Sequence, residues 1–136
     1  MSNIRVDLES VQVIEGQGVG EGDFELRIQV AEGSNVLIWP SLNGSTRVDK
    51  GGAAQSINKA IATYTVASGT LSKRYAIDVT EVDKGTLGQD DQGQSTLTFD
   101  LTPNMAPSTK SATISLKRPN MSYQGKVKVT MTAQQA

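Results

Sequence analysis

The sequence contains no cysteine and no histidine. Without cysteine there are no disulfides, no thiolate metal ligands and no thiol nucleophile. Without histidine there is no imidazole base, no serine–histidine triad and no ordinary zinc or iron site. An enzyme would have to rely on carboxylates, lysine or tyrosine alone, so we expect a protein with no catalytic residues.

Excess charge and long apolar runs are also missing. Lysine and arginine number 13 against 14 acidic residues, for a net charge of -1, so no basic field favours nucleic acid as a partner. No segment approaches the ~18 apolar residues of a membrane span, and the N-terminus does not follow the pattern of a signal peptide. We expect a soluble protein, in the cytoplasm or within an assembled particle, and no membrane partner.

What the sequence does contain is alternation of apolar and polar residues, which is typical of half-buried β-strands. It is clearest from Phe24 to Val30. Between Ile4 and Ile14 the alternation changes phase near Glu9, which predicts a β-bulge. Further strands are expected at residues 35–39, 61–67, 73–82, 95–101, 111–117 and 125–132.

The remaining segments favour loops. Residues 41–52 contain several glycine and asparagine breakers, and residues 53–60 favour a short helical turn or an irregular crossover. The 136 residues fit one domain, residues 1–136. About eight strands with almost no helix predict an all-β fold, an antiparallel Greek-key β-sandwich, with a closed β-barrel as the alternative.

One segment, residues 77–101, suggests a specific chemistry, because it reads as strand, acidic glycine-rich loop, strand. Calcium binds about six to eight oxygen ligands on flexible loops. In a Greek-key sandwich the glycine-rich loop at residues 16–23 can lie at the same end, which would add a further carboxylate. The candidate metal ligands are Asp23, Asp83, Asp90 and Asp91. The alternative is a solvated hairpin tip, since aspartate and glycine are ordinary turn residues.

The spacing of Val82-Asp83 and Asp91-Gln92-Gly93 resembles the third calcium-binding loop of the C-two domain family, the calcium- and lipid-binding β-sandwiches first defined in protein kinase C. Residues 22–26 are similar to the family's entry into its second strand, with Asp23 at the acidic position. The resemblance implies a β-sandwich with a calcium site at Asp23, Asp83 and Asp91. Gly85 stands where the family has a further acidic residue.

Two functions follow from the sequence. The first is a non-catalytic β-sandwich interaction module, resembling C-two domains and stabilised by calcium at its acidic loops. The alternative is a structural subunit of a multimeric particle or filament, such as a phage-like or virus-like assembly. Both predict protein partners or self-association, and calcium is the one cofactor expected.

Overall fold

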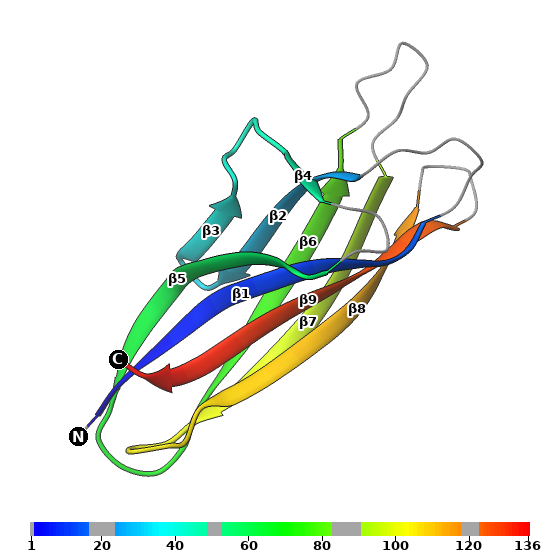
Figure 1. The fold of residues 1–136 in the computed structure, drawn as a ribbon. Coiled ribbons are helices and arrows are strands. Elements are labelled where there is room, and N and C mark those ends of the chain that lie inside the picture. The colour runs from blue at the N-terminus through cyan, green and yellow to red at the C-terminus, as the bar shows by residue number, and fades with distance from the viewer. Residues whose placement is uncertain (1, 17–23, 49–52, 83–90, 118–122) are drawn as a thin grey trace.

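The computed structural model describes residues 2–16, 24–48, 53–82, 91–117 and 123–136. These residues form nine β-strands and no helix (Figure 1). The strands are β1 (Ser2–Gly16), β2 (Phe24–Glu32), β3 (Asn35–Trp39), β4 (Thr46–Val48), β5 (Gln55–Val66), β6 (Leu71–Glu81), β7 (Asp91–Leu101), β8 (Ser108–Lys117) and β9 (Tyr123–Gln135).

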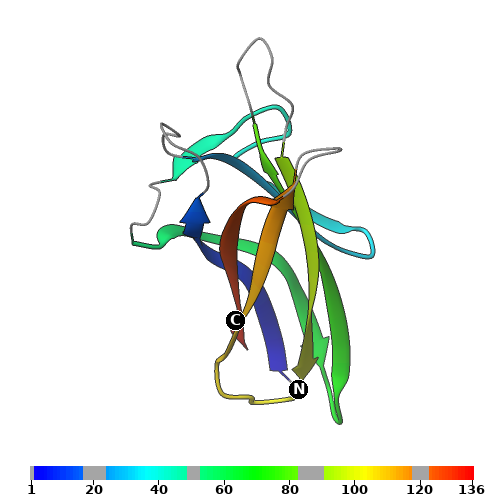
Figure 2. The ribbon, with the colours of Figure 1, turned by 90° about the vertical axis from the view of Figure 1, so that its right-hand side faces the viewer.

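Hydrogen bonds connect the strands in the order β3-β2-β6-β7-β8-β9-β1-β5, with β4 paired to β2, and every pair is antiparallel. In the described ranges β7 and β8 pair at one position, Gln92 with Lys117. The connected strands therefore turn there into two layers, β3-β2-β6-β7 and β8-β9-β1-β5, which face each other (Figure 2). This confirms the predicted antiparallel β-sandwich.

The core fills the space between the two layers. Alternate side chains of each long strand point inward, and Tyr75, Phe24 and Phe99 are the largest of those that are fully buried. The rings of Tyr75 and Phe99 meet edge to face, with centroids 6.2 Å apart and planes at 77°. Such an aromatic pair contributes about 0.5 to 1.5 kcal/mol beyond the burial of its area.

The predicted bulge in the first strand is confirmed. The pairing of β1 shifts between Leu8 and Ser10 with both of its neighbours, β5 and β9. The shift allows Leu8 and Val11 to face the same core although they are an odd number of residues apart, and neither side chain is exposed. A phase change in the alternation was therefore a reliable signal for this bulge.

The prediction for residues 53–60 was wrong, because β5 already begins at Gln55. Its pairing with β1 shifts twice, and Asn58 within it has a positive φ of 52°. These irregularities interrupt the alternation that would have marked a strand, and pairing with β1 holds the segment extended despite its local propensity. The predicted loop at 41–52 likewise contains β4, which makes nine strands instead of about eight.

Gly93 allows the two layers to meet at their shared corner. It was expected in a loop, but β7 begins at Asp91, so Gly93 is the third residue of a strand. A Cβ atom at this position would collide with the carbonyl oxygen of Ser115 and would lie 2.6 Å from Ile114 Cγ2. The backbone of β8 therefore passes over β7 at a distance that requires glycine.

We predict that Gly93→Ala lowers the free energy of unfolding by about 3 kcal/mol, at the upper end of the range for overpacking, because the backbone of β8 must move. Urea denaturation would measure the change. Gly69→Ala is the control: nothing lies within 4 Å of an added Cβ there, but φ is +68°, so it should cost about 1 kcal/mol. Equal losses in the two variants would show that crowding at the corner is unimportant.

Candidate functional site

Two carboxylates lie opposite each other where the β6–β7 hairpin ladder ends. Glu81 is the last residue of β6, Asp91 is the first of β7, and the two are direct partners in the ladder. Both belong to the inward-facing set of their strands, together with Val79 and Gly93. Asp91 is 1% exposed, and Glu81 Oε2 is buried. Directly opposed residues have Cβ atoms about 5 Å apart, so the two carboxyl groups lie close together.

This arrangement differs from the one expected for the metal ligands. Asp91 lies in a strand and points between the layers, whereas the sequence placed it on a loop. Asp23, Asp83 and Asp90 lie outside the described residues, so their convergence stays a prediction. Within the ranges that the structure describes, no three acidic side chains lie close enough together to hold a metal ion. Of the predicted ligands, Asp91 alone is described, and Glu81 is the carboxylate it faces.

A second polar cluster joins the two layers on the side away from the β7–β8 corner. The hydroxyl group of Tyr64, on β5, donates to Glu32 Oε1 over 2.7 Å and accepts from the hydroxyl group of Tyr75, also over 2.7 Å. Lys73 Nζ lies 3.9 Å from Glu32 Oε2 and 5.0 Å from the centre of the Tyr64 ring. β5 and β6 therefore meet through side chains, and a carboxylate ends the chain of hydroxyl groups.

Hydrogen bonds and burial together shift the pKa values of this cluster. The hydrogen bond from Tyr64 is the main cause that lowers the pKa of Glu32 below its ordinary value of 4.5, opposed by partial burial and helped by Asn35 and Lys73. Burial raises the pKa of Tyr75, and the hydrogen bond to Tyr64 raises it further. Burial also raises the pKa of Tyr64. Both phenols are therefore protonated at neutral pH and act as donors, as the geometry requires.

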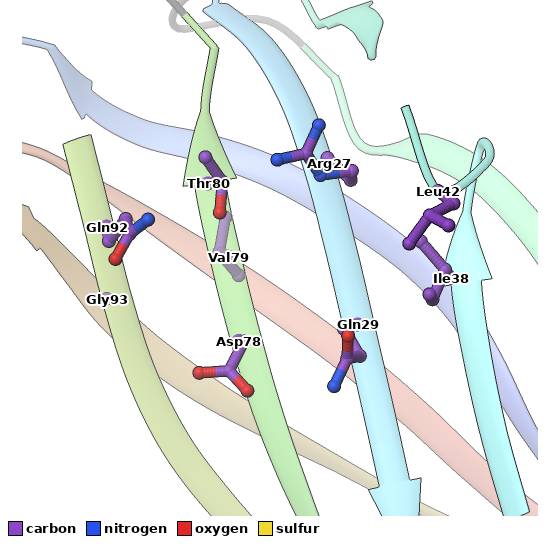
Figure 3. Close-up of a pocket in the computed structure, with 9 residues that line it drawn as sticks. All are labelled: Arg27, Gln29, Ile38, Leu42, Asp78, Val79, Thr80, Gln92 and Gly93. Carbon is purple, nitrogen blue, oxygen red and sulfur yellow. The ribbon is translucent and has the colours of Figure 1, made fainter. Parts of the chain in front are cut away.

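The third feature is a hollow of about 300 Å³ on the outer surface of the β3-β2-β6-β7 layer (Figure 3). Arg27 and Gln29 of β2 and Asp78 and Thr80 of β6 line it, with Ile38 of β3 on one side. Leu42, in the β3–β4 connection, lies beside Ile38 and is 67% exposed. The sequence did not predict this hollow, because the residues that line it come from separate strands.

Comparison with known proteins does not identify the chain. No protein-family model matches the sequence, and no curated protein matches it. Among solved structures, it is similar to the C-two A domain of plant extended synaptotagmin 1, with a TM-score of 0.43, 12% sequence identity and coverage of 99% of this chain and 95% of that one. Such a distant likeness does not assign a family, so the function has to be inferred from the residues of this chain.

The described residues contain no helix with the length and apolar character of a membrane span.

The tyrosine cluster makes stability depend on acid. Because the folded pKa of Glu32 lies below 4.5, the ionised carboxylate contributes stability that is fully present above pH 4.5. The contribution is lost as the pH falls through the folded pKa. We predict that Glu32→Gln is less stable than the natural protein at pH 7, and that the difference shrinks as the pH falls below 4.5.

Urea denaturation at a series of pH values would measure this difference. Tyr64→Phe removes the main cause of the shift, so it should reduce the acid dependence and cost about 1 to 2 kcal/mol at pH 7, as the loss of a buried hydrogen bond does. A difference between Glu32→Gln and the natural protein that stays constant from pH 7 to the lowest pH at which both remain folded would contradict the assignment.

Proposed function

We propose that this chain is a non-catalytic β-sandwich interaction module that calcium stabilises at the end of the sandwich formed by Glu81 and Asp91. The observation that supports it is the direct opposition of these two inward-pointing carboxylates across the β6–β7 ladder. Two neighbouring carboxyl groups offer the oxygen ligands that calcium prefers, so a bound calcium ion could be held by both strands at once.

The course of the chain favours further ligands at the same end. Leu26 of β2 pairs with Glu81, and β2 begins two residues earlier, at Phe24. Asp23 directly precedes Phe24 in the sequence, and Asp83 and Asp90 belong to the connection between Glu81 and Asp91. Three more carboxylates are thus attached within a few residues of the opposed pair, in line with the number of oxygen ligands that calcium requires.

The non-catalytic part of the proposal rests on the side chains available. The sequence has neither histidine nor cysteine. The chain of hydroxyl groups from Tyr75 through Tyr64 to Glu32 consists of phenols with raised pKa values, which are poor bases and poor nucleophiles at neutral pH.

We predict that millimolar calcium raises the melting temperature by several degrees, because a ligand that binds the folded state at ~100 times its dissociation constant stabilises it by about 2.7 kcal/mol. Asp83→Asn combined with Asp91→Asn should abolish the rise, since two ligands are neutralised. Differential scanning fluorimetry with calcium, magnesium and a chelator would measure it.

Asp100→Asn is the matched control, because Asp100 lies on the same strand, β7, near its other end and is exposed. This variant should keep the full calcium response. A melting temperature that does not change with calcium in the natural protein would overturn the calcium part of the proposal. It would leave the interaction role to be tested separately.

A second function is favoured by a different observation. Val36 and Leu42 are among the large apolar side chains most exposed to solvent in the described part of the chain, at 53% and 67%, and both belong to the β3 region of one layer. Contiguous exposed apolar groups mark association surfaces. We propose as the alternative that the chain is a structural subunit that associates through its protein faces, and sedimentation of the isolated protein would test it.

A further inference from the structure

The outer face of the β3-β2-β6-β7 layer is arranged in rows that cross the strands. The register places Val36, Ala31 and Ala76 side by side in one row and Ile38, Gln29 and Asp78 in the next. Arg27 and Thr80 form the third row. The first row is apolar and the other two become polar away from β3. An apolar border therefore runs beside a polar floor on one sheet surface.

The apolar border continues into Leu42, beside a hollow in the polar floor. Leu42 follows β3 and is 67% exposed beside the hollow of about 300 Å³ that Gln29, Asp78 and Thr80 line. Figure 3 shows Leu42 and Ile38 on one side of it and Asp78 and Thr80 across the floor. The same surface thus offers an apolar projection next to a cavity wide enough to receive an aliphatic side chain.

The charges are divided in the same way. Arg27 Nη1 reaches the carbonyl oxygen of Gly44 at 3.5 Å, so the cation is held toward the connection that also contains Leu42. Asp78 is the partner of Gln29, not of Arg27, and the two charges are diagonal to each other in the ladder. Arg27 and Asp78 form no ion pair with each other in the described structure. Each charge is available to a group outside the chain.

We infer that the occupant of this face is a second copy of the chain, related by a two-fold axis. A two-fold contact requires one surface to be complementary to itself. Here the projection and the cavity, and the cation and the anion, lie on a single face. Rotation about an axis between Leu42 and the hollow inserts Leu42 of each copy into the hollow of the other and brings Arg27 of each copy toward Asp78 of the other.

This inference deepens the alternative function and rests on it, since it names the partner and surface of the associating subunit. It does not depend on calcium, because Asp78 and Thr80 point out of the sandwich while Glu81 points in. A small polar molecule in the hollow is the competing occupant. It would use Arg27 and Asp78 but would leave Leu42 in water.

Charge reversal tests the pairing. Sedimentation equilibrium of the natural protein is expected to show a dimer at micromolar concentration. Arg27→Asp and Asp78→Arg should each weaken it about 100-fold, because two-fold symmetry applies every substitution twice and each lost pair is worth about tenfold. The double variant should dimerise within about tenfold of the natural protein.

A mixture of the two single variants is the sharpest measurement. One variant carries two acidic groups on the face and the other two basic groups, so each should be monomeric alone and the mixture should form a one-to-one dimer. Leu42→Ser should also weaken the dimer, and Arg74→Asp, an outward and exposed position on β6 away from the hollow, should not. Circular dichroism and melting temperature would confirm that each variant is folded.

The outcomes separate the inference from the function on which it rests. A natural protein that is monomeric up to about 100 µM overturns both. A dimer or larger assembly that all these variants leave intact overturns this surface while the subunit role stands. Monomeric single variants that fail to associate when mixed, or a double variant that stays monomeric, would exclude the Arg27–Asp78 pairing and overturn the inference.

Discussion

The structure depends on one contact, the passage of β8 over β7 at Gly93. Backbone pairing between the two layers in the described residues is limited to Gln92 with Lys117, next to this glycine. Buried side chains fill the space between the layers, and their close packing requires a fixed separation. A Cβ at position 93 would push the carbonyl oxygen of Ser115 outward, and the separation would change along both layers. The contact at Gly93 therefore determines the distance at which the inner side chains of the two layers pack.

The opposite side of the sandwich is held in a different way. β5 and β3 are the outer strands of their layers, and the described contact across this side includes the hydrogen bonds of Tyr64 with Glu32 and Tyr75. Burying a hydroxyl group without a hydrogen-bond partner is costly. Tyr75 therefore donates to Tyr64, and Tyr64 donates to the ionised carboxylate of Glu32. On one side the layers are joined by the close backbone contact of β8 with Gly93 of β7. On the other side they are joined by the long side chains of Tyr64, Tyr75 and Glu32. The carboxylate with a lowered pKa, Glu32, lies on the second side.

Alternation was enough to predict the fold, because the inner faces are almost purely apolar. The alternation is clear in residues Phe24 to Val30 and Ile4 to Val13. The bulge in β1 could also be predicted, because a change of phase is visible in the sequence of one strand. It failed for residues 55–60, where two register shifts with β1 and a positive φ at Asn58 remove the period. It failed again at Gly93, where glycine is required by the neighbouring strand β8 and not by a turn.

The acidic residues of the candidate site were found in the sequence, but Asp91 was placed in a loop, because composition does not show where a strand begins to pair. The hollow at Arg27 and Asp78 was missed, since cross-strand register is invisible in one strand.

β6 connects these features through its two faces. Tyr75, Ile77, Val79 and Glu81 point inward, and Arg74, Asp78 and Thr80 point outward. The proposed calcium ligands and the proposed dimer surface thus lie within four residues of each other and still face different surroundings. A cation at Glu81 would act inside, between the layers, where low dielectric strengthens its effect. Asp78 faces water until a partner covers it, so its charge is screened and serves to select the partner's orientation more than to bind it. The same strand can therefore support the sandwich from within and direct association from outside, because successive residues of a regular strand point to opposite faces.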